Sequence, residues 1–440
     1  MDSLTIKEWN GADMLETYEA LADTPYALFF DSNREGHPNN QWSFICWNPI
    51  ETIETKNGVI AHNGKNINET DFFSFLQGRL DFYNFKTNEY QIPFTGGAAG
   101  YFGYDLGRQL EKLPDQTIDD MKTPDACIGI YNNILAFDHK NNKAWKIGEA
   151  KLPPVKKQKT YTQAEASWKT YKADKDYCRD IKTVIDYIHA GEVYQVNLSR
   201  RFETELPEGF NAFGHYKTLR DINPAPFSAF MNFNNLTLVS CSPERFLSVK
   251  DSEVETRPIK GTLPSTQDAD ILIKSAKDRA ENTMIVDLLR NDLSKVCDYH
   301  SVKVPELCAL ETFAGLHHLV STVKGILQDN KKPTDLLRAC FPGGSITGAP
   351  KIRAMEIIEE LEETRRGPYC GAIGYIGFNG RMDTNIVIRT LVYTSGKAYL
   401  QTGGGIVSDS IPEKELQESL DKAAKIFESF KNSTCEEYVA

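Results

Sequence analysis

The sequence predicts an α+β fold in which antiparallel β-sheets are stacked on each other and helices pack on the outside. Three observations lead to this expectation: strand-like runs of aromatic and β-branched residues, stretches with helical periodicity, and short turns between consecutive strands. Short turns favour antiparallel pairing because parallel neighbours need long crossover connections. A chain of 440 residues is long enough for two domains or one large composite domain.

Residues 1–150 are expected to form an N-terminal part that is mostly sheet. The runs PYALFFD, QWSFICW and IGIYNNILAFD have strand composition and are bounded by Asn, Gly or Pro. Residues 151–170 are polar, rich in lysine and carry two prolines, which predicts a linker. Residues 171–440 would then form a second domain.

The second part of the chain alternates between helical and extended patterns. Helices are expected at 176–192, 268–290, 333–340, 350–365 and 412–430. Strands are expected at 194–204, 236–249, 252–262, 371–378, 384–394 and 397–402.

The charge balance narrows the kind of partner. The net charge is -11 and no Lys/Arg-rich block occurs, which argues against nucleic acid or an anionic membrane surface and favours a small-molecule substrate. The N-terminus lacks the basic start and apolar run of a signal peptide, and no stretch is apolar enough to span a membrane, so we expect a cytoplasmic protein. The nine cysteines are scattered and predict neither disulfides nor zinc.

Two helical stretches carry carboxylates at the same spacing. Asp278 and Glu281 lie at i,i+3, as do Glu415 and Glu418, so each pair shares one helix face. If the two faces converge, the carboxylates would repel unless they share a cation, and oxygen ligands suit Mg²⁺ rather than zinc. The alternative is two solvated helix faces, which is the commoner outcome for this pattern.

Other segments also allow either a structural or a functional interpretation. The glycine run Gly403–Gly405 permits a close backbone approach to a ligand, although a flexible turn would look the same. Arg389 interrupts an apolar strand pattern and needs an anionic partner there. Glu244 likewise follows an apolar strand, and Lys260 stands in the extended segment TRPIKGTLP.

The motifs taken together resemble the chorismate-utilising enzymes, which include component I of anthranilate synthase, component I of aminodeoxychorismate synthase, and the isochorismate and salicylate synthases. The resemblance covers nearly the whole chain. It rests on the segments GEVYQVNLSRRF, NPAPFSAF, SPERFL, ETRPIKGT, DRAENTMIVDLLRNDLSKV, HHLVSTVKG, PGGSITGAPKIRAMEIIEELE, RRGPYCGAIGY, IRT and GGGIVSDSIPEKELQESLDKA. It implies the fold of that family, with residues 171–440 as the chorismate-binding catalytic domain.

The family resemblance implies a role for each candidate residue. Glu281 and Glu418 match Mg²⁺ ligands, with Asp278 and Glu415 behind them. The chorismate contacts implied in the same way are Gly261, Thr262, His318, Tyr369, Arg389, Gly403, Gly404, Gly405 and Lys422. A tryptophan pocket known in relatives matches Ser32, Pro226, Phe227 and Ser228, and Asn39, Asn40, Gln41 and Trp42 are expected to line it.

Lys260 and Gln195 indicate the branch of the family. Anthranilate-forming members resemble PIAGT where this chain has PIKGT, and water-using members carry a lysine near the position of Gln195. The resemblance therefore implies that chorismate and ammonia give 4-amino-4-deoxychorismate for 4-aminobenzoate and folate synthesis. Lys260 would form a covalent adduct at C2, and Glu244 would be the proton donor.

The source of the ammonia is implied to be another protein. The chain has no glutaminase-like nucleophile elbow around a cysteine, so a separate glutamine amidotransferase subunit is the expected partner. The alternatives are an anthranilate synthase component I and, from another class, a non-catalytic tryptophan-binding regulatory subunit.

Overall fold

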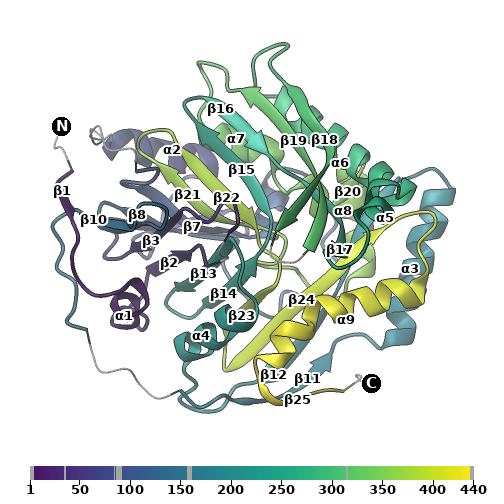
Figure 1. Ribbon diagram of the computed structural model, residues 1–440, viewed down its shortest axis with the longest axis horizontal. Helices are drawn as coiled ribbons and strands as arrows, with labels where there is room; N and C mark the ends of the chain where they lie inside the picture. Colours follow the sequence, from purple (N-terminus) through teal and green to yellow (C-terminus); the bar gives the residue numbers. More distant parts are fainter. Residues whose placement is uncertain are drawn as a thin grey trace.

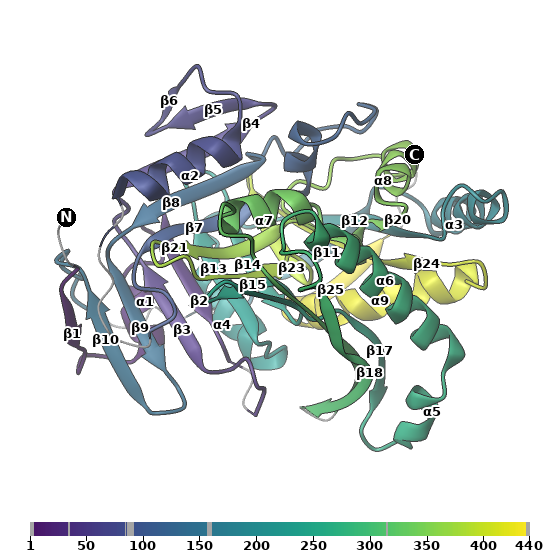
Figure 2. The same cartoon turned by 90° about the horizontal axis from the view of Figure 1, so that it is seen from above.

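Two large, mostly antiparallel sheets form the centre of the molecule. The computed structural model describes residues 4–33, 36–83, 85, 92–155, 161–313 and 316–436. Within these residues one sheet has 13 strands and the other has 12, and helices lie around them (Figure 1). Figure 2 shows the same arrangement from above. The predicted α+β fold of stacked antiparallel sheets with outer helices is confirmed.

Both sheets combine strands from the two sides of the predicted linker. The first sheet runs in the order β1 (Ile6–Glu8), β10 (Lys143–Ile147), β9 (Ile134–Asp138), β3 (Trp42–Cys46), β2 (Ala27–Asp31), β13 (Phe227–Asn232), β14 (Thr237–Ser242), β23 (Thr390–Thr394), β24 (Lys397–Ile406), β12 (Gln195–Glu205), β11 (Glu165–Thr170) and β25 (Lys431–Glu436), with β20 (Gly348–Ala349) paired to β12. The second runs β17 (Ile259–Pro264), β19 (Leu316–Ile326), β16 (Glu253–Thr256), β15 (Arg245–Lys250), β22 (Met382–Ile386), β21 (Ala372–Gly377), β7 (Gly97–Phe102), β8 (Ala126–Tyr131), β4 (Glu51–Lys56), β5 (Val59–His62) and β6 (Lys65–Asn66), with β18 (Lys303–Phe313) paired to β19.

The side chains of a strand alternate between its two faces and so contribute to two hydrophobic layers. In β2, Leu28 packs between the sheets with Tyr101, while its neighbour Phe29 packs on the opposite face with Tyr18 and Phe213. Successive side chains of a strand point to opposite faces, so a strand covered on both sides is apolar throughout. This is why the N-terminal strands appear in the sequence as continuous apolar runs.

Helices cover the outer faces of the sheets. They are α1 (Met14–Glu19), α2 (Phe72–Tyr83), α3 (Asp174–His189), α4 (Ala212–Ile222), α5 (Ala269–Ile273), α6 (Ala276–Ser294), α7 (Pro333–Cys340), α8 (Lys351–Leu361) and α9 (Pro412–Glu428), with short 3₁₀ turns η1 (Tyr104–Gln109) and η2 (Gly344–Ile346). The helix predicted at 268–290 is two helices, because the side chain of Ser275 accepts from the backbone N–H of Asp278 and begins α6 there.

Two further expectations differ from the structure, and one alternative that the sequence left open is decided. The predicted linker 151–170 ends in β11, where buried Ala166 and Trp168 alternate with exposed residues, a strand pattern that the composition of the stretch conceals. The strand predicted at 384–394 is broken into β22 and β23, and Arg389 in the break has a φ of 51°. Gly403–Gly405 lie inside β24 and form no turn.

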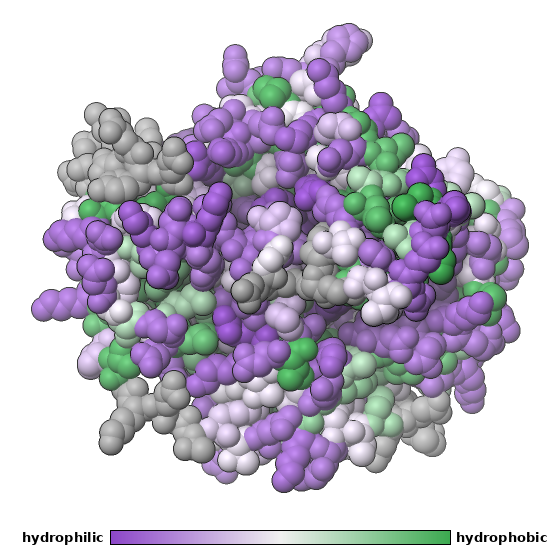
Figure 3. Space-filling model, viewed as in Figure 1, coloured by the Kyte–Doolittle hydropathy of each residue, from purple (hydrophilic) through white to green (hydrophobic). Residues whose placement is uncertain are grey.

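The structure agrees with the polar composition of the chain in two respects. No helix in the described part of the chain is long and apolar enough to cross a membrane. On the face seen in Figure 3, hydrophilic residues predominate and apolar residues occur in small groups.

Candidate active site

Helices α6 and α9 bring the two predicted carboxylate pairs to one place. Lys277 Nζ lies 4.0 Å from Glu281 on α6 and 3.9 Å from Glu415 on α9. A Cβ atom at Gly404 of β24 would lie 3.3 Å from Glu415 Oε2 and 3.5 Å from Glu418 Oε1. The carboxylates therefore converge on the glycine face of β24 and are not spread over two solvated helix faces.

The protonation of these carboxylates reflects burial and crowding. Burial raises the pKa of Glu281, and the nearby carboxylates of Asp278 and Glu415 raise it further. Burial also raises the pKa of Glu415, although the Ser410 hydroxyl donates to it at 2.7 Å. Burial would raise the pKa of Glu418 too, but Lys422 at 2.7 Å, together with Lys260 and Lys277, outweighs burial and the pKa is lowered.

The donor chemistry of this cluster fits a magnesium ion that shares its coordination with a ligand. Within the described residues no group of three or more His, Cys, Asp or Glu side chains is arranged to hold a metal. Mg²⁺ is commonly held by one or two carboxylates together with water and substrate oxygens, so two carboxylates are sufficient. Like-charged carboxylates close to one another also favour a bound cation.

Lys260 of β17 reaches the same space from the second sheet. Its amine lies 4.0 Å from Glu281 Oε2, and the side chain is 17% exposed. A Cβ at Gly405 would lie 3.4 Å from this amine and 2.7 Å from the amide nitrogen of Gln195. The next residue, Gly261, has a φ of 71° at a bulge, and a Cβ there would meet the Asp278 carboxyl carbon at 3.0 Å. The backbone of Gly261 thus favours glycine, and Gly405 leaves the space beside the Lys260 amine free of a side chain.

Glu244 is a second acid in the site with a different environment. It directly precedes β15, and the Ser345 hydroxyl of η2 donates to Glu244 Oε1 at 3.1 Å. Burial raises the pKa of Glu244, and Lys260, Ser345, Lys422 and Arg389 oppose this shift without cancelling it. A carboxyl group with a raised pKa retains its proton closer to neutral pH, which is what a general acid requires.

The guanidinium group of Arg389 requires an anionic partner. It makes no ion pair with any described residue, and burial lowers its pKa. A partly buried and unpaired cation is costly, and the cost is removed by a bound carboxylate or phosphate. Tyr369, which precedes β21, is buried, and burial raises its pKa.

The remaining predicted contacts lie on the surrounding strands. Lys422 of α9 donates to the Gly403 carbonyl at 2.7 Å, which ties the helix to β24. His318 of β19 is buried and stands opposite Thr262 in the strand register. The Thr262 side chain lies outside the described part of the structure.

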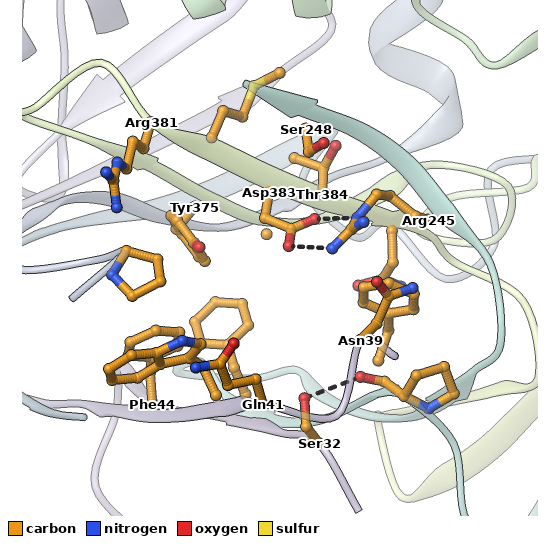
Figure 4. Close-up of a pocket in the computed structure, with 18 of the residues that line it drawn as sticks. Ser32, Asn39, Gln41, Phe44, Arg245, Ser248, Tyr375, Arg381, Asp383 and Thr384 are labelled. Atoms are coloured by element: carbon orange, nitrogen blue, oxygen red, sulfur yellow. Dashed lines mark hydrogen bonds and ion pairs between the residues drawn. The ribbon is translucent and has the colours of Figure 1, made fainter. Parts of the chain in front are cut away.

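A separate cavity contains most of the predicted tryptophan-pocket residues (Figure 4). It has a volume of about 760 Å³. Among its lining residues are Ser32, Asn39, Gln41, Trp42, Pro226, Phe227 and Ser228, whereas Asn40 does not line it. Its walls include the rings of Phe44 and Tyr375, and the Ser32 hydroxyl donates to the Pro226 carbonyl at 3.1 Å. The cavity does not include Lys260 or Glu281, so the aromatic cavity and the candidate active site are distinct.

Comparisons with known proteins identify the family of this chain. The profile of the chorismate binding enzyme family matches residues 25–428. The chain belongs to that family. It is 42% identical over 440 residues to aminodeoxychorismate synthase component 1 of Salmonella typhimurium, covering 96% of each chain. It is 34% identical to anthranilate synthase component 1 of Acetivibrio thermocellus, covering 95% of each.

A solved structure supports the fold as well. Anthranilate synthase component I from Streptococcus pneumoniae aligns with a TM-score of 0.80 and 34% identity, over 88% of this chain and 92% of that one. The family assignment establishes an enzyme that acts on chorismate, and the finer choice between its members depends on particular residues.

Sequence reasoning overlooked two residues of this site. Lys277 bridges the carboxylates of two helices, and its i,i+4 spacing from Glu281 was the available signal. Ser345 holds Glu244, but nothing local connects positions that are 101 residues apart.

Proposed function

We propose that this enzyme converts chorismate and ammonia to 4-amino-4-deoxychorismate in the 4-aminobenzoate branch of folate synthesis. The observation that carries the proposal is the place of Lys260, whose amine faces the carboxylate cluster and the glycine wall of β24. Relatives named aminodeoxychorismate synthase component 1 support the same choice. A lysine here supplies a nucleophile that the anthranilate-forming branch, with alanine in its place, does not have.

Substrate binding would use the unpaired charges of the site. Arg389 would hold the carboxylate of the enolpyruvyl group as a bidentate partner, with Tyr369 beside it. Mg²⁺ held by Glu281 and Glu418 would bind the ring carboxylate and neutralise its charge. The close approach of the ring requires Gly403–Gly405 without side chains, since a Cβ at Gly405 would occupy the space in front of Lys260.

The substitution then proceeds in two steps. The Lys260 amine, after losing its proton, attacks C2 of chorismate; both conjugated ring double bonds shift, from C1–C2 and C5–C6 to C1–C6 and C4–C5, and the C4 hydroxyl leaves as water with a proton from Glu244. Ammonia next attacks C4, both double bonds return, and the bond from C2 to the lysine nitrogen breaks as a proton passes from the incoming nitrogen to the departing lysine amine. The net change is chorismate plus ammonia to aminodeoxychorismate plus water, and the enolpyruvyl group stays in place.

The ammonia would come from a glutamine amidotransferase subunit. The names of the relatives, component 1, indicate that those proteins work with a further component. Free ammonium at alkaline pH should replace the partner, because only unprotonated ammonia is the nucleophile.

A product assay tests the proposal. The purified chain is incubated with chorismate, Mg²⁺ and ammonium, and the product is divided between samples with and without an added aminodeoxychorismate lyase. We expect 4-aminobenzoate only where the lyase is present, and activity that is lost with a chelator and restored by Mg²⁺. Fluorescent anthranilate formed without any lyase would overturn the proposal in favour of an anthranilate synthase. A folded but inactive chain would favour the regulatory alternative.

The covalent step has its own test. Intact-protein mass spectrometry after mixing with chorismate, without ammonia, should show added mass that maps to Lys260. The Lys260→Ala variant should show none under the same conditions. Borohydride should not increase trapping, because the adduct is an amine and not an imine.

We propose that the aromatic cavity binds tryptophan, as the matching pocket does in relatives. Its combination of stacked rings with paired polar groups suits an aromatic zwitterion.

A further inference from the structure

Arg366 is a fully buried cation whose partner, Glu362, is buried too. Their side chains are 1% and 5% exposed, and they lie four residues apart in the segment that follows α8. The guanidinium donates from Nε to Glu362 Oε2 at 2.9 Å and from Nη2 to Glu362 Oε1 at 2.6 Å. Neither residue belongs to the set that contacts chorismate or Mg²⁺ in the proposed function.

The pair is bonded to backbone that forms the active site. Arg366 Nη1 donates to the Ile346 carbonyl of η2 at 2.9 Å, and Nη2 donates to the Asn197 carbonyl of β12 at 2.6 Å. Glu362 Oε1 accepts from the backbone N–H and the hydroxyl of Ser199, both at 2.8 Å. In the strand register Asn197 stands opposite Gly405, and Ser199 stands opposite Gly403.

Two further contacts reach groups with proposed chemical roles. Ile346 directly follows Ser345, whose hydroxyl donates to Glu244 at 3.1 Å. The face of the Arg366 guanidinium lies 5.7 Å from the ring centroid of Tyr369 and 4.6 Å from that of Tyr104. A single side chain therefore touches the turn beside Glu244, the strand behind the glycine wall, and Tyr369.

A contribution to the stability of the protein is a weak explanation for this buried ion pair. Replacing a buried ion pair by apolar residues of similar size is often neutral or stabilising, because two charges must be desolvated. What the guanidinium adds is a fixed fork that bonds several acceptors at once, and a lysine lacks that geometry. The pair is better explained by a role in keeping the backbone and side chains around it in a fixed arrangement.

We propose that Arg366 is a positioning residue that fixes η2, β12 and Tyr369 relative to one another, and so sets the orientation of Glu244. The inference rests on the proposed function, because it assigns Glu244 as the proton donor. Arg366 itself touches no reacting atom.

The test compares Arg366→Lys with the matched variant Arg201→Lys. Arg201 is also 1% exposed, pairs with Asp120 and stacks at 4.3 Å over the Tyr171 ring, but none of its described contacts involves the active site. Both substitutions keep the charge and remove the fork. Among the described residues, the guanidinium of Arg366 makes four hydrogen bonds and that of Arg201 makes one, so the melting temperature should fall more in Arg366→Lys. We expect kcat to fall about 10–100-fold in Arg366→Lys, as misplacement of catalytic groups produces, and to stay near the wild-type value in Arg201→Lys. The KM for chorismate should change less than kcat.

A pH profile separates positioning from general loosening. It is measured for both variants at a fixed concentration of unprotonated ammonia. If η2 shifts, Ser345 no longer donates to Glu244, and this bond is one of the interactions that hold the Glu244 pKa down. The alkaline limb of kcat should therefore move to higher pH in Arg366→Lys and stay in place in Arg201→Lys. Lys260, Lys422 and Arg389 also face Glu244 and are unaltered in both variants, while Cys370 adjoins it.

Equal kcat and equal pH profiles for the two variants would overturn the positioning role. If Arg366→Lys does not fold, Ser199→Ala provides the measurement, since it removes only the hydroxyl bond to Glu362. It should lower kcat about threefold with little change in melting temperature, and an unchanged kcat would contradict the inference. Failure of the proposed function itself is recognised separately, because the wild-type enzyme would then form no aminodeoxychorismate.

Discussion

The active site and the aromatic cavity contain adjacent residues of the chain, but they differ in whether their charged side chains are paired within the protein. Glu244 faces Lys260 and Ser345, whereas Arg245 lines the cavity. Arg245 forms a bidentate pair with Asp383, with both bonds at 2.9 Å. In the active site, by contrast, Arg389 has no ion pair among the described residues and Lys260 lies 4.0 Å from Glu281. The arginine of the cavity is therefore paired within the protein, whereas the arginine of the active site is left for a ligand.

The aromatic cavity and the proposed catalytic residues do not coincide. The aromatic cavity has about 760 Å³, and none of the catalytic candidates lines it. Crowded carboxylates, a guanidinium without an ion pair among the described residues and an acid with a raised pKa are the features from which we propose that an anionic substrate binds beside Lys260. The predictions that follow test the contrast between the active site, where Arg389 has no ion pair among the described residues, and the aromatic cavity, where Arg245 is paired.

The largest effect is expected for Lys260→Ala. If the lysine is the nucleophile, its loss removes the two-step route and should lower kcat more than about 10⁴-fold, beyond the usual range for a proton donor. Steady-state aminodeoxychorismate formation with ammonium measures it. Lys277→Ala is the control, because Lys277 lies in the same cluster at similar distances from carboxylates but has no covalent role. Equal losses in the two variants would contradict nucleophilic catalysis.

Glu244→Gln should follow, with a loss of about 10²–10⁴-fold in kcat. A general acid must be protonated, so activity is present below its pKa and falls as pH rises through it. Burial raises the pKa of Glu244, which places this fall above the ordinary carboxyl range of about 4.3. Glutamine cannot donate the proton, and the variant should lose that alkaline limb. A limb retained at the same pH in Glu244→Gln would assign it to another group.

Arg389→Met and Arg245→Met test the contrast directly. Arg389→Met should lower kcat/KM about 10–100-fold, the worth of charged hydrogen bonds to a carboxylate, and leave the free energy of unfolding unchanged or higher. Arg245→Met should reduce the free energy of unfolding by about 1–3 kcal/mol, because it leaves Asp383 without its partner, with a much smaller effect on kcat/KM. Chemical denaturation and steady-state kinetics of both variants decide the matter. Matching stability losses would show that both arginines are structural.

Local patterns predicted most strands, most helices and the spacing of the carboxylate pairs because each signal lies within a few residues. The i,i+3 spacing of Asp278 and Glu281 specifies one helix face, and the structure brings that face to α9. The break at Arg389 was not predictable, since its positive φ interrupts an otherwise continuous apolar strand pattern. Ser345 and Arg366 act on groups more than 100 residues away, and no periodicity carries such a contact.

The smallest effect on catalysis is expected from a ligand bound in the aromatic cavity, where Arg245 is paired with Asp383. If the aromatic cavity binds tryptophan, a concentration 100 times the dissociation constant should stabilise the protein by about 2.7 kcal/mol, while kcat with ammonium changes less than twofold. Thermal unfolding with and without L-tryptophan measures this. Because the cavity does not include Lys260, the Lys260→Ala variant should show the same stabilisation as the wild-type enzyme. Competition between tryptophan and chorismate would instead show that the two regions are one site, and it would remove the distinction between paired and unpaired charge.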